Sequence, residues 1–222
     1  MKLALFDLDH TLLPLDSDYA WGQFTVDIGW RDAETHTRAN DAFYEQYKAG
    51  TLDIHAYIRF SVAPLAEHGV EQSAAAHRRF MDAVIRPAMQ PQAIELVQRH
   101  QAAGDQVVIV TATNEFVTRP IAQAFGVTEL IAIELERDAQ GNPTGAIRGT
   151  PSFREGKVAR VEQWLTARGR SWADVTYSSF YSDSLNDLPL LEKVREPVAT
   201  NPDERLRVLA TERGWRILSL FE

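Results

Sequence analysis

The most constraining feature of this 222-residue chain is its N-terminal segment, an apolar run that ends in two closely spaced carboxylates. Residues 2–6 read Lys-Leu-Ala-Leu-Phe, and Asp7 and Asp9 follow with one leucine between them. Side chains two positions apart share a face of a strand, so both carboxylates should leave the strand in the same direction. Two such charges repel unless a cation or a proton lies between them. Taken alone, the pair is equally compatible with a strand end at which Asp9 caps a turn.

The composition narrows the possible partners. Apolar residues make up 45% and charged residues 24% of the chain, as in ordinary globular proteins. The net charge is −8 and no basic run stands out, which argues against nucleic acid or an anionic membrane as the main partner. The chain has no cysteine, so a metal would be held by oxygen or imidazole.

The sequence also predicts where the protein resides. No apolar run approaches the roughly 18 residues of a transmembrane helix. The first apolar run is too short for a signal peptide, because Asp7 and Asp9 interrupt it and no small-residue cleavage site follows. We therefore expect a cytoplasmic protein. The sequence carries no signal for an oligomeric state.

Residues 16–87 lack long β-branched runs and are predicted to be helical. Phe43, Tyr44 and Tyr47 recur at helical spacing, and we interpret such aromatic stripes as core. Pro64 is expected to bend or end the second of these helices. The expected helices span residues 32–48, 52–66 and 71–85.

From residue 88 onwards, helices and strands alternate, which is typical of βαβ units. The expected strands span 106–111, 130–133, 175–181, 197–199 and 215–218. The expected helices span 91–103, 114–125, 155–168, 185–193 and 203–213. Residues 133–147 carry Gly-Asn-Pro-Thr-Gly in their middle and should form a β-hairpin.

The alternation predicts the α/β class, with a doubly wound, Rossmann-like parallel sheet. We expect residues 1–15 and 88–222 to form the α/β core domain, and residues 16–87 a helical cap inserted after the first strand. Ligands of such sheets bind beyond the carboxyl ends of the strands. The residues selected by this rule are Asp7, Asp9, Thr111, Ser182 and Asp183.

Thr111 ends the second predicted strand, and Thr113 and Asn114 open the following helix. Hydroxyl groups and free amides at a helix N-terminus can bind an anion, so we expect these residues to contact a substrate. Simple N-capping is the alternative explanation for the same residues.

Lys157 lies in the first turn of a predicted helix, where the macrodipole disfavours a cation by roughly 0.3–1 kcal/mol. A neighbouring anion would account for this position, and so would a solvated surface lysine.

Asp183 follows a strand, whereas Asn186 and Asp187 fall in the first turn of the next helix. If that strand lies beside the first one, Asp183 joins Asp7 and Asp9 at one edge of the sheet. Carboxylates without thiolate or histidine favour a hard cation, and Mg²⁺ fits best because it keeps waters and takes few carboxylates.

Four segments together resemble the motifs of the haloacid dehalogenase (HAD) superfamily. The helical insertion and residues 181–190 are similar to the phosphoserine-phosphatase-like branch. This resemblance covers essentially the whole chain, and residues 16–87 least. The four segments are Asp7-Leu8-Asp9-His10-Thr11-Leu12, Thr111, Lys157 and Asp183-Ser184-Leu185-Asn186-Asp187.

The resemblance implies a catalytic role for each motif. Asp7 would be the nucleophile that becomes an aspartyl phosphate, and Asp9 would be the general acid and base. Thr111 and Lys157 would hold the phosphoryl oxygens. Mg²⁺ would be bound by the carboxylates of Asp7 and Asp183 and by the backbone carbonyl of Asp9.

Further residues are implied around this centre. Asp187 would order Lys157 or a metal-bound water, and Asn186 would touch the phosphate or nearby substrate. Family members that recognise an amino-acid phosphate use an acidic residue after the first motif and a cap arginine. Asp16 and Arg59 are the candidates for these two positions.

We therefore expect a Mg²⁺-dependent phosphatase that hydrolyses a small phosphorylated metabolite such as phosphoserine or histidinol phosphate. A haloacid dehalogenase is one alternative, but it would have no use for Asp9, because no leaving alkoxide needs a proton. A receiver-like signalling protein that accepts a phosphoryl group is another. Receivers resemble this chain less, because they are shorter and carry adjacent acidic residues after the first strand.

Overall fold

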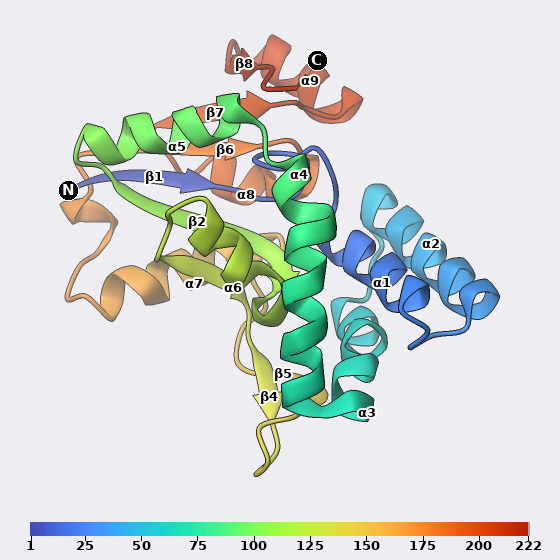
Figure 1. Cartoon of the computed structure of the whole chain (residues 1–222). Coiled ribbons are helices and arrows are strands. Elements are labelled where there is room, and N and C mark those ends of the chain that lie inside the picture. The colour runs from blue at the N-terminus through green and yellow to red at the C-terminus, as the bar shows by residue number, and fades with distance from the viewer. Residues whose placement is uncertain (222) are drawn as a thin grey trace.

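The computed structural model describes residues 1–221 and shows a parallel sheet with a helical insertion at one side (Figure 1). Within these residues, six parallel strands form the sheet in the order β3-β2-β1-β6-β7-β8. The α/β, Rossmann-like fold predicted from the sequence is therefore confirmed. The strands are β1 (Lys2–Phe6), β2 (Gln106–Asn114), β3 (Leu130–Ile133), β6 (Tyr177–Ser182), β7 (Glu196–Thr200) and β8 (Arg216–Leu218).

Helices cover both faces of the sheet because the strands are apolar on both sides. In β1, Ala4 and Phe6 pack into one core cluster, whereas Leu3 and Leu5 pack into the other. Helices α5 (Pro91–Ala102) and α6 (Glu115–Ala124) contribute to the first cluster. The second cluster is covered by α7 (Glu155–Thr166), α8 (Leu188–Leu191) and α9 (Glu204–Glu212).

The central position of β1 determines which loops meet. Phe6, the last residue of β1, is paired with Ile109 of β2 on one side and with Tyr181 of β6 on the other. The chain segments that follow these residues therefore lie at one edge of the sheet. This is the point where the strand order reverses, which is the usual ligand site of doubly wound folds.

The insertion after β1 is helical, as expected, but its details differ from the prediction. Helix α1 (Ser17–Asp27) was not predicted, because its buried residues do not follow a single apolar stripe and Gly22 weakens its helix propensity. Pro64 does not end its helix; the break falls at Gly69, whose φ of 77° only glycine adopts readily. The elements are α1, α2 (Ala33–Ala49), α3 (Ile54–Phe80), η1 (Met81–Ile85) and α4 (Arg86–Ala88).

The C-terminal end of α2 is held by side chains from the other part of the chain. Asn186 Nδ2 donates to the carbonyl of Tyr47 at 3.0 Å, and Arg205 Nη1 donates to the carbonyl of Lys48 at 3.1 Å. Arg154 donates to the carbonyl of the capping residue Gly50. These three contacts, which we call the α2 clamp, satisfy the carbonyls of Lys48 and Gly50 and add a donor to that of Tyr47, which also accepts from the Gly50 amide.

The predicted hairpin is present as β4 (Leu135–Arg137) and β5 (Pro143–Ile147), and β5 packs against α3. In residues 1–221, no helix combines the length and apolar character that crossing a membrane requires.

The start of α7 fits closely against the preceding loop. A methyl group on Gly156 would lie 2.0 Å from the carbonyl oxygen of Pro151. We predict that Gly156→Ala lowers the free energy of unfolding by about 2–3 kcal/mol in urea titrations, because backbone must move. Gly169→Ala at the other end of α7, where φ is 66° and the space is open, is the control and should cost about 1 kcal/mol. Equal losses would contradict the close fit.

Candidate active site

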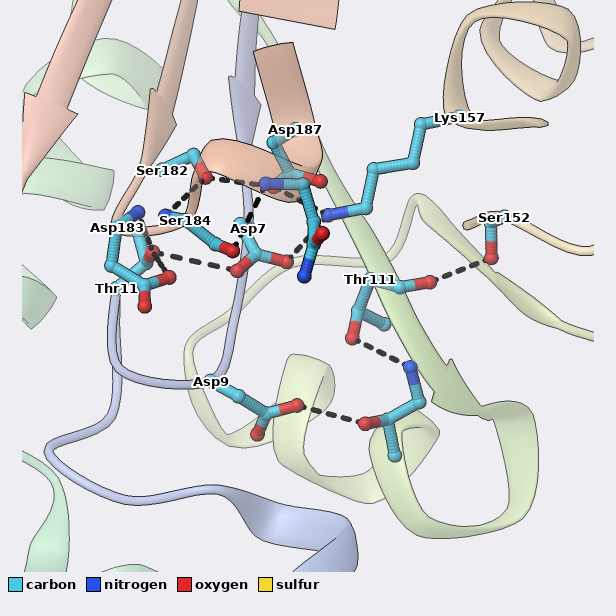
Figure 2. Close-up of polar contacts among 12 residues, drawn as sticks. Asp7, Asp9, Thr11, Thr111, Ser152, Lys157, Ser182, Asp183, Ser184 and Asp187 are labelled. Atoms are coloured by element: carbon cyan, nitrogen blue, oxygen red, sulfur yellow. Dashed lines mark hydrogen bonds and ion pairs between the residues drawn. The ribbon is translucent and has the colours of Figure 1, made fainter. Parts of the chain in front are cut away.

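A buried lysine between two aspartates forms the centre of the site (Figure 2). Lys157 Nζ lies 2.8 Å from Asp7 Oδ1 and 2.7 Å from Asp187 Oδ2. All three side chains are almost fully buried. Burial by itself lowers the pKa of Lys157, but the charges of Asp187 and Asp7 outweigh it and raise this pKa above its ordinary value. Lys157 is therefore a permanent cation, and its first-turn position is explained by these two anions.

Asp187 is in turn held by the end of β6. Its Oδ2 accepts hydrogen bonds from Lys157 and, at 2.7 Å, from Ser182 Oγ. Burial, followed by the charge of Asp7, raises the pKa of Asp187 to about 6, although Lys157 and Ser182 oppose the shift. Sequence reasoning singled out Ser182 only as a strand end, whereas the structure shows that it fixes Asp187.

Asp183 and Asp7 face each other across a threonine that sequence reasoning had not singled out as a site residue. Thr11 Oγ1 lies 3.1 Å from Asp183 Oδ1 and 3.5 Å from Asp7 Oδ2, and it accepts from the Asp183 amide at 3.0 Å. One hydroxyl proton cannot neutralise two carboxylates. Burial and the charges of Asp7 and Asp187 raise the pKa of Asp183 well above its ordinary value. Within the described chain, no basic side chain pairs with Asp183.

This donor set fits a hard divalent cation. Asp7 and Asp183 supply two carboxylates at one edge of the sheet. Across residues 1–221 no three His, Cys, Asp or Glu side chains gather as a metal site. Mg²⁺ commonly binds through one or two carboxylates while it keeps several waters.

Asp9 is held apart from the Lys157 cluster, as Figure 2 shows. Its Oδ1 accepts from the Ser17 amide at 2.7 Å and its Oδ2 accepts from Thr113 Oγ1 at 2.8 Å. Burial, followed by the charge of Asp16, raises the pKa of Asp9 to about 6. The two aspartates therefore differ in their surroundings: Asp7 is paired with a cation, whereas Asp9 is held by neutral donors and can carry a proton near neutral pH.

Thr111 lies inside β2 rather than at its end, because the strand runs on to Asn114. Its Oγ1 accepts from the Thr113 amide at 3.1 Å, and its carbonyl accepts from Ser152 Oγ at 2.6 Å. Asn114 Oδ1 accepts from the amides of Phe116 and Val117 and thereby caps α6. Asn114 is 1% exposed and does not line the pocket described below, and its capping contacts match the N-capping alternative; a contact of Asn114 with substrate stays a prediction.

A pocket lies between this cluster and the helices of the insertion. Its lining holds several carboxylates and an aromatic wall, and no Lys or Arg of residues 1–221 contributes to it. Burial lowers the pKa of His10, which also lines the pocket, so this ring does not supply a positive charge. The acidic lining residues are Asp7, Asp9, Asp16 and Asp18, and the aromatic ones are Tyr19, Phe43, Tyr44, Tyr47, Tyr57 and Phe153.

The aromatic wall corrects the interpretation of these helices as mere core. Phe43, Tyr44 and Tyr47 lie on one face of α2, and Tyr57 comes from α3. The signal in the sequence was the tyrosines themselves, because a phenolic hydroxyl needs a polar partner that a purely apolar core does not offer.

The structure separates the two cap residues that the sequence suggested. Asp16 lines the pocket and caps α1, where its Oδ1 accepts from the amides of Asp18 and Tyr19. Arg59 does not line the pocket; it is exposed on α3 and packs beside Gly145 of β5.

Comparison with known proteins gives consistent matches. Residues 4–192 match the family model of the haloacid dehalogenase-like hydrolases. The histidinol-phosphatase of Neisseria meningitidis serogroup C (strain 8013) is 46% identical over 218 residues, which cover 98% of each chain. Phosphoserine phosphatase SerB1 of Mycobacterium tuberculosis (strain ATCC 25618 / H37Rv) is 33% identical over 96% of this chain and 69% of its own.

Solved structures agree with the fold. A protein of unknown function from Bordetella pertussis Tohama I superposes with a TM-score of 0.94 at 52% identity, over 99% of each chain. A substrate-bound phosphoserine phosphatase superposes with a TM-score of 0.68 at 18% identity, over 98% of this chain and 92% of that one.

The lysine at the centre should be essential to stability. We predict that Lys157→Met lowers the free energy of unfolding by about 3–5 kcal/mol in urea titrations at pH 7.5, because two buried carboxylates lose their cation. Lys193→Met is the matched control. Lys193 is 42% exposed beside Glu162, so its loss should cost at most about 1 kcal/mol. A similar cost for both variants would contradict the role of Lys157.

Proposed function

This chain belongs to the haloacid dehalogenase-like hydrolase family and is a phosphatase, and from that premise we propose that it hydrolyses histidinol phosphate with Mg²⁺ as cofactor. The proposal includes an aspartyl-phosphate intermediate on Asp7. A cytoplasmic location stays a prediction from the sequence.

The observation that carries the substrate assignment is the charge of the pocket lining. The lining contains acidic and aromatic side chains but no Lys or Arg within residues 1–221. Phosphoserine carries a carboxylate, which such a pocket would repel and leave without a partner. Histidinol phosphate carries an ammonium group and an imidazole ring and has no carboxylate. The 46% identity to the Neisseria histidinol-phosphatase supports the same choice.

In the proposed first step, an Asp7 carboxylate oxygen attacks phosphorus and the bond to the alkoxide oxygen of histidinol breaks. Asp9 gives its proton to that oxygen, which its pKa of about 6 allows. Asp9 then takes a proton from the water that attacks the aspartyl phosphate. This second step releases inorganic phosphate and restores both carboxyl groups.

The neighbouring residues stabilise the charge that builds up. Lys157 offsets the charge of Asp7 and would hold a phosphoryl oxygen together with the hydroxyl of Thr111. Asp187 keeps Lys157 in place through the 2.7 Å contact. Asn186 donates to Tyr47, so we assign it to positioning α2 as well as to the phosphate side of the pocket.

Mg²⁺ would be held by the carboxylates of Asp7 and Asp183 and by the carbonyl of Asp9. It would supply the positive charge that lets a carboxylate approach a phosphate dianion. Asp183, which lies across Thr11 from Asp7 and pairs with no basic side chain of the described residues, is the feature of this chain that supports the assignment.

The decisive test compares substrates. We predict that the purified protein releases phosphate from L-histidinol phosphate with a kcat/KM roughly 100-fold or more above that for O-phosphoserine, because only the latter places a carboxylate in the acidic pocket. Asp7→Asn should lower kcat by roughly 10⁴-fold or more on every substrate. Equal or better hydrolysis of phosphoserine would refute the assignment, and activity in Asp7→Asn would refute the mechanism.

The metal can be tested by stability as well as by activity. We predict that a chelator abolishes turnover and that Mg²⁺ restores it. Mg²⁺ at ten times its Kd should also raise the free energy of unfolding of the chelator-treated protein by about 1.4 kcal/mol. Asp183→Asn should lose this stabilisation, whereas Asp32→Asn, an exposed N-cap of α2, should retain it. Full turnover in excess chelator would contradict the prediction.

A further inference from the structure

Asp18 is a buried carboxylate of the pocket to which the proposed chemistry gives no task. It lies on α1, lines the pocket and is 3% exposed. Its Oδ1 accepts a hydrogen bond from Asn114 Nδ2 at 3.3 Å. Its Oδ2 is buried and has no hydrogen-bond partner within residues 1–221. A buried oxygen without a partner is costly to a fold, so such an atom in a pocket points to a ligand that completes it.

Asp18 lies close to one ring of the aromatic wall, that of Tyr57, which in turn contacts Phe43. Phe43 and Tyr57 both line the pocket, and their ring centroids are 5.4 Å apart. Burial and then the charge of Asp18 raise the pKa of Tyr57 well above its ordinary value, so its hydroxyl is close to Asp18. As a hydrogen-bond donor the Tyr57 hydroxyl also lowers the pKa of Asp18, against the larger effect of burial, yet no hydrogen bond of ordinary geometry reaches the buried Oδ2.

The number of available acceptors distinguishes the two cationic groups of histidinol phosphate. An ammonium group has three N–H donors and needs several acceptors when it is buried. Asp18 has one oxygen without a hydrogen-bond partner and lies close to the Tyr57 ring, which suits the single outward N–H of a planar ring. Asp16 has a different environment: its Oδ1 is already used by two amides at the start of α1.

We propose that Asp18 and the rings of Phe43 and Tyr57 form an imidazole subsite, in which Asp18 Oδ2 is hydrogen-bonded to the distal ring nitrogen of histidinol phosphate. This inference rests on the proposed function. An aromatic ring stacks on aromatic neighbours, and a charge-assisted bond to the ring offsets the burial of the carboxylate. Burial also raises the pKa of Asp18 well above its ordinary value, so one proton is shared readily between the carboxyl group and the ring.

The first test uses alaninol phosphate, which retains the ammonium and phosphate groups of histidinol phosphate but lacks the ring. The preference for histidinol phosphate, expressed as a ratio of kcat/KM values, should fall by about 10–100-fold in Asp18→Asn. Asn114 would hold the remaining carbonyl oxygen of the new amide, which leaves an NH₂ group facing the ring. Asp32→Asn makes the same chemical change outside the pocket and should leave the ratio unchanged.

A second test uses the unaltered protein and therefore does not depend on the folding of a variant. Histidinol methylated on its distal ring nitrogen should inhibit hydrolysis of an aryl phosphate about 10-fold more weakly than histidinol methylated on the proximal nitrogen. Equal inhibition by the two, or an unchanged ratio in a folded Asp18→Asn variant, overturns the subsite and leaves the proposed function standing. No preference of the unaltered protein for histidinol phosphate over alaninol phosphate also overturns the subsite, whereas the proposed function is refuted by the comparison with phosphoserine.

Discussion

The ion-paired contact of Lys157 with Asp7 and Asp187 is the interaction on which the rest of the site depends. Its three members lie on three separate parts of the chain, and only the central position of β1 between β2 and β6 brings them together. Each member would be costly to bury alone. The contact therefore exists only where the sheet, the start of α7 and the segment after β6 are all in place. Fold and chemistry are coupled through this one lysine.

Around that contact the site has a surplus of negative charge. Lys157 offsets part of the charge of Asp7 and Asp187, whereas Asp9 and Asp183 face neutral donors. The raised pKa values of these groups share a common first cause, which is burial. A pocket of this kind is suited to a ligand with a positively charged group at one end. At its other end, the phosphate, a metal cation would accompany it. The proposed preference for a cationic phosphate ester over an amino-acid phosphate rests on these acidic surroundings.

The site residues near the strand ends could be predicted from the sequence, whereas most of the side chains that contact them could not. Asp7, Asp9, Lys157 and Asp183 followed from strand spacing and from motifs whose residues lie near one another along the chain. Thr11 and Asp18 have roles that depend on contacts made across the fold, which no local pattern records. Arg59, suggested by the family resemblance, does not line the pocket, because it lies on α3 beside β5, a contact that the sequence does not record.

The α2 clamp has a consequence for how such a protein can diversify. Residues of the core donate hydrogen bonds to backbone carbonyls of α2. Every amino acid has this carbonyl, whatever its side chain. The clamp contacts are therefore independent of the side chains that this helix carries toward the pocket, although Phe43 and Tyr44 also pack against Tyr57 and Tyr19. Substitutions at these two positions can alter the shape of the ligand chamber while the clamp itself is retained. New selectivity is thus accessible by point changes, while the reacting groups stay fixed in the sheet.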